Sequence, residues 1–389
     1  MPKLRFKGFT DDWEQRKLID GCEYVDYRGK TPNKTENGVF LVTAKNVKAG
    51  YIDYEASQEY IAEEDYDEVM HRGMPQIGDV LITTEAPCGN VAQVDREDIA
   101  LAQRIIKYRG HENQIDNTYL KHYLLTPYFQ GVLESKSSGG TVQGIKGSIL
   151  HQQIIRHPSF EEQVKIGRHL DSIDNLIALH QRKCDELQKV KKYMLQKMFP
   201  KKGEKVPEIR FAGFTGDWEQ RKISDMCSIS TGKSNTQDKV DDGEYPFYVR
   251  SSIIERSTKY LYDEEAVLTV GDGVGTGKVF HYVNGKYDLH QRCYRMYDFT
   301  DALNAKYFYH VFSKLFYNRV MSMTAKTSVD SVRMEMIADM KIPTPNIKEQ
   351  EKVEAVFTNL DNLIALHQRK HETLKEIKKY MLQNMFPEK

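Results

Sequence analysis

The sequence predicts an α+β protein built by internal duplication, with two mixed α/β domains and a pair of long helices that pack together. Two repeats support this fold class. Residues 4–18, LRFKGFTDDWEQRKL, recur as residues 209–223, IRFAGFTGDWEQRKI, with 11 of 15 positions identical. Residues 174–200 recur as residues 361–387, with 20 of 27 positions identical. The segments between the repeats differ strongly, so the chain has near-constant ends and divergent middles.

We call the first repeat (residues 4–18 and 209–223) the head and the second (residues 174–200 and 361–387) the tail. The tails have the pattern of amphipathic helices. Mostly apolar side chains recur at steps of three and four over residues 173–198 and 360–385, close to the spacing of a coiled-coil seam. Pro200 and Pro387 end these stretches, because proline cannot continue a helix. A helix over residues 161–198 would be about 57 Å long. Since a lone helix with one apolar stripe is unstable in water, the two copies are expected to pack together.

The divergent middles predict strands and shorter helices. β-type runs lie between Gly, Pro and Asp residues, and strands are expected at residues 80–83, 90–94, 104–108, 245–249, 266–270 and 278–283. Helices are expected over residues 119–134 and 303–320. Two weak matches between the halves persist here, Gln103-Arg104 with Gln291-Arg292 and residues 140–145 with 327–332. The expected segments are a domain (1–155), a helical spacer (156–203), a second domain (204–342) and a second spacer (343–389).

Composition excludes several classes of protein. The chain has 389 residues and a formal net charge of zero, so bulk charge gives no argument for nucleic-acid binding. No apolar run reaches the ~18 residues of a membrane span, and the N-terminus lacks the apolar stretch of a signal peptide. The five cysteines are odd in number and never spaced C-x-x-C. A cytoplasmic protein without a disulfide framework is therefore expected.

The glycine-rich run at residues 271–278, GDGVGTGK, invites a phosphate-loop interpretation. Its spacing is wrong, because Asp272 stands where the first glycine belongs and Val279 replaces the Mg²⁺-binding Ser or Thr. A loop that connects two strands is expected instead. The sequence also lacks the D/N-P-P-Y/F motif of amino-methyltransferases, a G-x-S-x-G motif and a nuclease-like carboxylate cluster. The chain itself is therefore not expected to be a catalyst.

Two side-chain pairs in the helices have metal-ligand spacing. His180 and Cys184, and His367 and His371, each lie four residues apart on equivalent faces. Facing helices could bring the four ligands of a zinc site together from such pairs. The same residues could also form a polar layer that fixes the register of the helix seam. The sequence does not decide between them, and no metal site is assigned.

Two groups of loops carry side chains suited to DNA. Arg and Lys can bind guanine, Asn and Gln can bind adenine, and all of these side chains can contact phosphates. In the first half the candidate DNA-binding residues are Arg28, Lys30, Thr31, Asn33, Lys34, Lys45, Asn46 and Lys146. In the second half they are Lys233, Ser234, Asn235, Arg250, Ser251, Lys278 and Lys326. Taken singly, each loop is also compatible with an ordinary surface loop.

The unit of head, divergent middle and helix, present twice, resembles the specificity subunit of Type I restriction–modification systems over essentially the whole chain. Its most specific motifs are KKYMLQKMFP (191–200), KKYMLQNMFP (378–387), PSFEEQ (158–163), PNIKEQ (345–350) and GDVLIT (78–83). The second half departs from the last motif with AVLTVG at residues 266–271.

The resemblance implies two target recognition domains, each reading one half of a split double-stranded DNA site, and an antiparallel helix pair that sets their spacing. It also implies two modification subunits and restriction subunits as partners, which use S-adenosylmethionine, ATP and Mg²⁺ to methylate adenine and cleave DNA. No cofactor is expected in this chain, and no membrane contact. The residues expected to bind partner subunits are Gln181, Lys183, Lys191, Lys192, Gln368, Lys370, Lys378 and Lys379.

Two other functions remain open at this point. A coiled-coil scaffold whose variable domains bind proteins or glycans explains the repeat and the neutral charge equally well. An autonomous DNA-modifying enzyme would need the catalytic motifs that the sequence lacks. A DNA-binding assay with partner subunits present distinguishes the first of these from a DNA reader.

Overall fold

The computed structural model describes residues 1–27, 32–139, 143–273, 275–323 and 331–387. The chain forms two compact units. The first unit contains residues 1–182 and 368–389, and the second contains residues 183–367. Each of the long helices α6 (Phe160–Lys197) and α9 (Ile347–Asn384) is divided between the two units, with one part in each. The predicted duplication and α+β fold class are confirmed.

The described residues of the first unit form three small sheets, one of which is the pair of β1 (Glu14–Lys17) and β9 (Ile154–His157) described below. Strands β2 (Cys22–Asp26), β8 (Ile105–Gly110), β5 (Val80–Thr84) and β6 (Cys88–Gln93) form an antiparallel sheet in that order. The second sheet has the order β4 (Tyr60–Ile61), β3 (Val39–Val42) and β7 (Ile99–Leu101), in which β3 and β7 run parallel. The short helices are α1 (Leu18–Gly21), η1 (Glu63–Asp65), α2 (Tyr66–Val69), α3 (Asn117–Leu124), α4 (Pro127–Lys136) and α5 (Gly147–His151).

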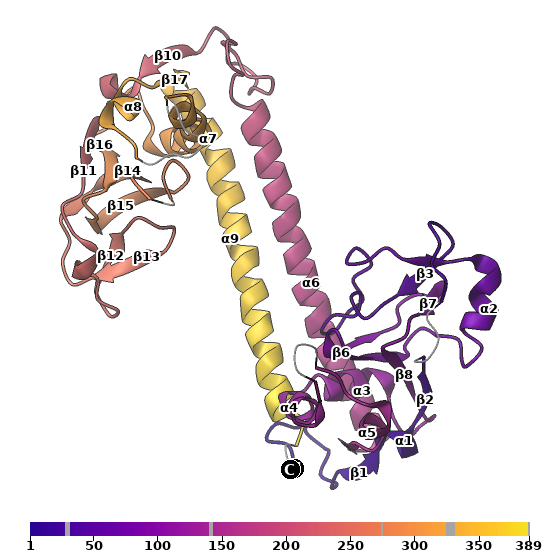
Figure 1. The fold of residues 1–389 in the computed structure, drawn as a ribbon. Helices are drawn as coiled ribbons and strands as arrows, with labels where there is room; N and C mark the ends of the chain where they lie inside the picture. The colour runs from indigo at the N-terminus through magenta and orange to yellow at the C-terminus, as the bar shows by residue number, and fades with distance from the viewer. Residues whose placement is uncertain (28–31, 140–142, 274, 324–330, 388–389) are drawn as a thin grey trace. The chain divides into compact units, whose positions relative to one another are not determined.

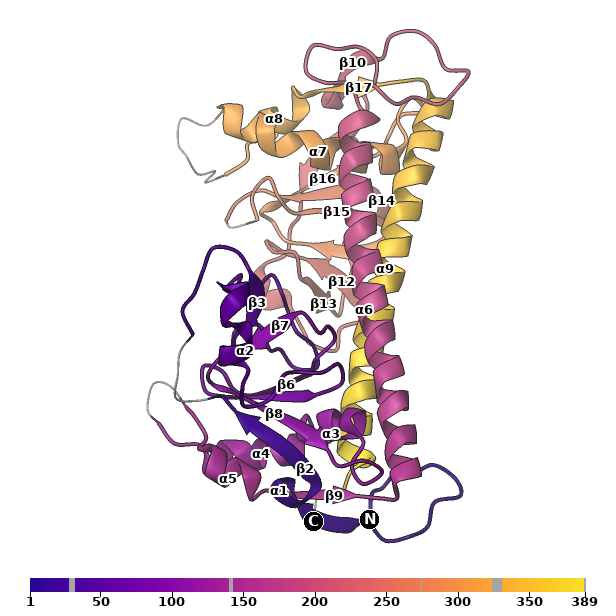
Figure 2. The ribbon, with the colours of Figure 1, turned by 90° about the vertical axis from the view of Figure 1, so that its right-hand side faces the viewer.

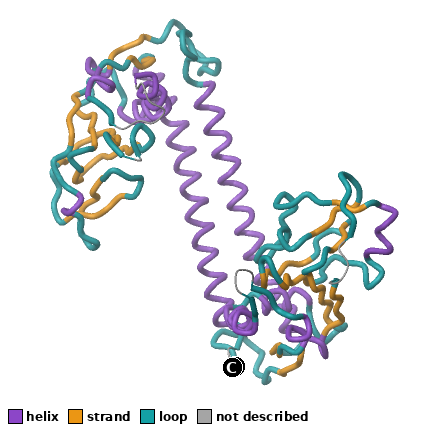
Figure 3. Tube along the Cα trace, viewed as in Figure 1, coloured by secondary structure: helices purple, strands orange, loops and turns teal. Residues whose placement is uncertain are grey.

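The second unit joins the equivalent strands into one six-stranded sheet (Figure 3). Its order is β11 (Ser228–Thr231), β16 (Cys293–Tyr297), β14 (Tyr262–Val270), β15 (Phe280–Leu289), β12 (Tyr245–Tyr248) and β13 (Ile254–Ser257). The ten-residue β15 takes the places of both β6 and β7, which explains why one sheet replaces two. The helices are η2 (Ile223–Asp225), η3 (Thr236–Asp238), α7 (Ala305–Met323) and α8 (Met334–Ala338).

One helix in each unit lies between the sheet and a long helix (Figure 1). In the first unit, α3 buries Tyr119 and Leu120 in one core with Val80 of the sheet and Leu170 of α6. In the second unit, α7 buries a run of phenylalanines in one core with the sheet and with α9, through Phe308, Phe312, Phe316, Val267 and Phe357. The shared core fixes each domain to its long helices, because separating them would expose this apolar surface.

The predicted strands are confirmed, with ends that shift by a few residues. The helix expected over residues 303–320 is α7, which begins after Asn304, whose Oδ1 accepts a hydrogen bond from the N–H of Tyr307 at 2.8 Å. The single helix expected over residues 119–134 is wrong, because the structure divides it into α3 and α4. Pro127 causes the break: it lacks an N–H and disfavours helical geometry at Thr126, which caps α4 instead.

The repeated head forms the same small sheet in both units. Strand β1 (Glu14–Lys17) pairs with β9 (Ile154–His157), and β10 (Glu219–Lys222) pairs with β17 (Lys341–Thr344). Both partner strands directly precede a long helix. The sequence EQRK therefore recurs because it holds the start of each domain against the start of its long helix.

A buried ion pair reinforces this contact in each unit. Arg5 donates from Nε and Nη2 to both carboxylate oxygens of Glu162, each at 2.8 Å. Arg210 donates in the same way to Glu349, at 2.7 and 2.9 Å. Both glutamates are fully buried at the beginning of their helices. The head motif and the PSFEEQ and PNIKEQ segments thus belong together in space.

The glutamine that follows each of these glutamates is also buried and fully bonded. Gln163 accepts a hydrogen bond from the N–H of Asp116 at 3.0 Å and donates to the carbonyls of Gln114 and Pro158. Gln350 makes the equivalent bonds with the N–H of Asn304 and the carbonyls of Ala302 and Pro345. One side chain therefore ties the start of α3 or α7 to the start of the long helix.

The apolar tails of the helices complete the cores. Phe386 packs in the first unit with the ring of Trp13 at a centroid distance of 6.3 Å. Phe199 packs in the second unit with Trp218, also at 6.3 Å. The tail of α6, which follows the first domain, thus belongs to the core of the second unit, and the tail of α9 belongs to the core of the first.

Helices α6 and α9 pack side by side within each unit (Figures 1 and 2). In the first unit, Lys378 Nζ lies 2.6 Å from Asp174 Oδ1. In the second unit, Lys191 pairs with Asp361, and Cys184 Sγ lies 3.6 Å from the carbonyl oxygen of Ile364. Residue numbers rise along one helix as they fall along the other, so the pair is antiparallel, as the resemblance implied. None of the described helices is long and apolar enough to cross a membrane.

Candidate nucleic-acid interface

A pair of parallel strands brings polar residues to the same edge in both units. In the first unit, β3 and β7 end side by side, and the chain continues into the loop of Lys45 and into Gln103-Arg104. In the second unit, β12 and β15 end side by side and lead to Arg250 and to Gln291-Arg292. Because parallel strands end at the same edge, residues far apart in sequence meet there.

A carboxylate follows a neighbouring strand and pairs with the arginine of each dipeptide. Glu85 follows β5, and its Oε1 lies 2.6 Å from Arg104 Nε. Asp272 follows β14 after one glycine, and its Oδ2 lies 3.7 Å from Arg292 Nε. Asp272 also accepts a hydrogen bond from Arg250 Nη1 at 3.3 Å. The two pairs are topologically equivalent and partly exposed.

In both units a further segment of the chain bonds to the backbone directly before the carboxylate residue. The N–H of Ile145 donates to the carbonyl of Thr84 at 2.9 Å, and the N–H of Val332 donates to the carbonyl of Gly271 at 2.6 Å. The next residues are the exposed Lys146 and Arg333. We call these groups the strand-end clusters: Lys45, Glu85, Gln103, Arg104 and Lys146 in the first unit, and Arg250, Asp272, Gln291, Arg292 and Arg333 in the second.

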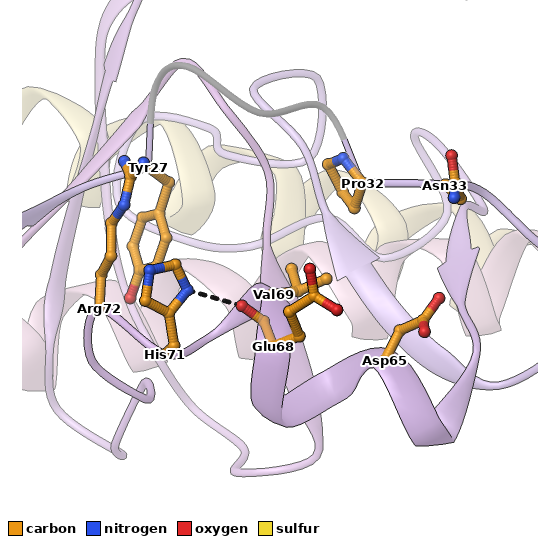
Figure 4. A pocket seen from close by; sticks show the side chains of 8 residues that line it. All are labelled: Tyr27, Pro32, Asn33, Asp65, Glu68, Val69, His71 and Arg72. Atoms are coloured by element: carbon orange, nitrogen blue, oxygen red, sulfur yellow. Dashed lines mark hydrogen bonds between the residues drawn. The ribbon is translucent and has the colours of Figure 1, made fainter.

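Hollows in the surface of the first unit adjoin its strand-end cluster. Gln103 and Arg104 line two of them, which also include Lys34 and Lys45 in one case and Glu85 and Lys146 in the other. Pro32 lines the first of these and a further pocket shown in Figure 4, whose lining is Tyr27, Pro32, Asn33, Asp65, Glu68, Val69, His71 and Arg72. In that view His71 reaches the carbonyl of Glu68, at 2.6 Å from Nδ1. The predicted residues Asn33, Lys34, Lys45 and Lys146 thus line adjoining hollows.

The second unit brings together part of its predicted set. Asn235 Oδ1 accepts a hydrogen bond from Gln291 Nε2, and the N–H of Lys233 donates to the carbonyl of Leu289 at 3.1 Å. Arg250 belongs to the strand-end cluster, and Ser251 Oγ caps the next turn by accepting from the N–H of Ile253 at 3.2 Å. Lys278 is exposed in the loop between β14 and β15, and its Nζ lies 5.2 Å from the ring centre of Tyr317.

Two predicted DNA contacts are wrong, because the side chains are buried and already bonded. Asn46 is 0% exposed; its Oδ1 accepts from the N–H of Thr43, and its Nδ2 donates to the carbonyls of Asp53 and Ser57. Ser234 is 2% exposed and donates to Asp288 Oδ1 at 2.6 Å. These side chains shape their loops instead of facing DNA. Arg28, Lys30, Thr31 and Lys326 lie outside the described residues.

The sequence prediction missed most of the strand-end clusters: Glu85, Gln103, Arg104, Asp272, Gln291, Arg292 and Arg333. The matching Gln-Arg dipeptides in otherwise divergent segments were the one available signal.

The surroundings of the clusters lower the pKa of one acidic and one basic side chain. Although burial raises the pKa of Glu59, hydrogen bonds from Lys34 and Ser57 lower it below its usual value. Burial and the charge of Arg250 lower the pKa of His290 below its usual value.

The predicted partner-binding residues fall into two groups. Gln181, Lys183, Lys192, Gln368, Lys370 and Lys379 are exposed on α6 and α9. Lys191 and Lys378 are instead committed to ion pairs with Asp361 and Asp174 across the helix pair. These two lysines therefore hold the helix pair together, and their expected role in partner binding stays a prediction.

A cluster of possible metal ligands lies elsewhere, at His122, Asp171 and Asp174, whose ligand atoms lie within 4.8 Å of one another. Lys121 and Lys378 pair with the two carboxylates, so ammonium groups already neutralise them. Burial lowers the pKa of His122 to about 4 despite its hydrogen bond with Asp171. These contacts indicate a structural polar cluster between α3 and the helix pair.

Comparison with known families gives one extended match. The model of the family described as "Type I restriction modification DNA specificity domain" matches residues 10–189 and 215–376. The two matched segments correspond to the two repeats and together cover most of the chain.

Individual relatives agree with this match. The Type I restriction enzyme MjaVIII specificity subunit of Methanocaldococcus jannaschii is 23% identical over 404 residues, which cover 96% of this chain and 91% of the relative. The putative Type I restriction enzyme MjaX specificity subunit of the same organism is 22% identical, covering 98% and 94%. The crystal structure of the Type I restriction–modification S subunit of M. genitalium has the same fold, with a TM-score of 0.74, 14% identity and 99% of each chain covered.

Proposed function

The chain belongs to the Type I restriction–modification DNA specificity family, and from this membership we propose that residues 1–155 and 204–342 each read one half of a split DNA site. Its role is DNA sequence specificity, exercised through two target recognition domains. The observation that carries the proposal is the strand-end cluster, which has the same construction in two domains of divergent sequence. Each cluster contains three cationic residues and one carboxylate that pairs with arginine, and clustered cations are suited to phosphate contact.

The proposal assigns the chemistry to partner subunits. The chain supplies specificity and a scaffold to a DNA adenine methyltransferase that uses S-adenosylmethionine, and to restriction subunits that use ATP and Mg²⁺. Family membership supports this division, since the relatives are named as specificity subunits of restriction enzymes.

Exposed apolar residues on the long helices support binding of two copies of one partner. Leu176 and Leu179 of α6 are 43% and 40% exposed, and Ile377 and Tyr380 of α9 are 39% and 59% exposed. All four belong to the first unit, and the contact of Asp174 with Lys378 sets them at similar levels along the helix pair. The second unit exposes the residues that are 187 positions away in the repeat, namely Leu363, Leu366, Val190 and Tyr193. We call these sets the first and second apolar patches.

Duplicate patches suit duplicate partners, because equal surfaces bind equal molecules. We expect the variant Ile377→Ser/Tyr380→Ser to bind one modification subunit where the parent chain binds two. The variant Val190→Ser/Tyr193→Ser should lose the other copy, and the combination should lose both. Native mass spectrometry of the reconstituted complex measures these stoichiometries. Full occupancy in the combined variant would show that the patches are not the docking surface.

DNA binding is tested through its salt dependence. We expect Lys45→Gln and Lys233→Gln each to lower the slope of log K against log salt by about 1, because each removes one phosphate contact. Arg250→Gln should do the same in the second unit, and Lys30→Gln extends the series. The measurement is fluorescence anisotropy of labelled duplex DNA with the modification subunits present. An unchanged slope in every variant would remove these loops from the interface, and absence of DNA binding by the parent complex would refute the proposed function.

A further inference from the structure

The guanidinium groups of Arg104 and Arg292 differ in one respect from the structural arginines of this protein. Arg109 and Arg210 each use Nε and Nη2 together on one buried carboxylate, as in the bonds of Arg109 to Asp79 at 2.6 and 2.8 Å. Such a fork-to-fork pair consumes the edge with which arginine binds anions. These arginines are therefore committed to the fold.

Arg104 and Arg292 meet their carboxylates through Nε. Within the described part of the chain, no side-chain hydrogen bond holds the Nη1 or Nη2 group of either arginine. Their side chains are 48% and 65% exposed. The carboxylate thus orients the guanidinium and leaves its outer N–H groups available, a geometry suited to binding an oxyanion.

The backbone holds both arginines in equivalent places. The carbonyl of Arg104 accepts a hydrogen bond from the N–H of Thr84 at 2.9 Å, and the carbonyl of Arg292 accepts one from the N–H of Gly271 at 2.8 Å. Arg104 has a φ of +80°, a region that side chains other than glycine rarely adopt and that costs free energy. Arg104 thus combines a strained backbone with an exposed guanidinium group, which indicates a function beyond stabilising the fold.

We propose that Arg104 and Arg292 are the sequence-independent phosphate grips of the two recognition domains, and that the divergent loops around them read the bases. The inference rests on the proposed function. Two domains that read different half-sites differ where they contact bases. The residues that both domains share are then suited to contact the phosphate backbone, which is the same in all DNA. The Arg-carboxylate pair is common to both domains, whereas most of the sequence between the repeats differs strongly.

The test compares Arg104→Gln and Arg292→Gln with the parent chain, in complex with the modification subunits. Anisotropy is measured on a target duplex and on an unrelated duplex across a salt series. Each substitution should weaken binding to both duplexes by the same factor, about tenfold at 0.1 M salt, because log K falls with about 0.9 log salt for each phosphate contact. The methylated sequence should not change. Arg104→Lys keeps the charge and should keep the slope.

Matched controls are Arg96→Gln and Arg221→Gln, which remove exposed arginines that pair with Asp98 and Glu219. They should leave affinity and slope unchanged. Weaker binding to the target duplex alone, or a changed base in one half of the methylated site, would overturn the inference and make Arg104 or Arg292 a base reader. If the parent complex binds target and unrelated duplexes equally, the proposed function fails, independently of the role of these arginines.

Discussion

Replacing Arg210 by methionine is expected to destabilise the second unit by about 3–5 kcal/mol, because Glu349 would remain as an unpaired charge in the protein interior. Glu349 is fully buried, and both of its oxygens bond only to that guanidinium in the described structure. The equivalent change Arg5→Met should destabilise the first unit for the same reason, since Glu162 is also fully buried. Urea unfolding, followed by tryptophan fluorescence at Trp218 or Trp13, measures the effect.

The chain offers matched comparisons for this prediction. Arg221 belongs to the same head motif but pairs with the exposed Glu219, with 44% of its own side chain exposed. Arg221→Met should therefore change stability by no more than about 0.5 kcal/mol. The double variant Arg210→Met/Glu349→Met should recover most of the loss, because an apolar pair can replace a buried ion pair. Equal, small effects of Arg210→Met and Arg221→Met would mean that the head does not clamp the helix.

The functional cost of this change follows from what the ion pair joins. The head strand β10 and the start of α9 hold the second domain on its helix. Loosening this contact should reduce DNA affinity without changing the sequence that is read, because the strand-end cluster itself is untouched. The buried pair therefore separates the positioning of a domain from the reading of bases.

The repeated segments were predictable because their sequence pattern is local and occurs twice in the chain. The helix expected over residues 161–198 differs from α6 by one residue at each end, and the apolar stripe over residues 360–385 lies on α9 except for its last residue, since the apolar positions of both helices repeat. The divided helix at Pro127 was also within reach of the sequence, because proline disfavours a helix at the residue before it. The antiparallel direction was not, as it came from the resemblance alone.

The errors at the candidate interface have a different cause. Asn46 and Lys45 are neighbours of similar polarity, yet one is buried and bonded and the other is exposed. That difference depends on Asp53 and Ser57, which fold back over Asn46. The meeting of Arg104 with Glu85 depends on which strands are neighbours in the sheet. Such facts belong to tertiary structure, and no local pattern in the sequence expresses them.

Exchange of one domain is expected to have the largest effect on function. The structure supplies the junctions: replacing residues 22–151 by the equivalent segment of another family member leaves β1, β9 and the pair of Arg5 with Glu162 in place. The second unit and both long helices also keep all of their own residues, while the α3 that packs on α6 comes from the exchanged segment. Because the divergent segment contains the whole first strand-end cluster, we expect one half of the recognised site to change and the other half and the spacer to remain.

The most direct test of two independent readers on a common helical scaffold is to map methylated adenines in DNA from cells that carry this exchanged chain and its modification subunits. The account predicts a hybrid site, with one new half, one old half and the same number of bases between them. A control exchange of residues 228–338 should change the opposite half alone. If either exchange alters both halves together, or leaves the site as it was, the two domains do not read DNA separately and the account is wrong.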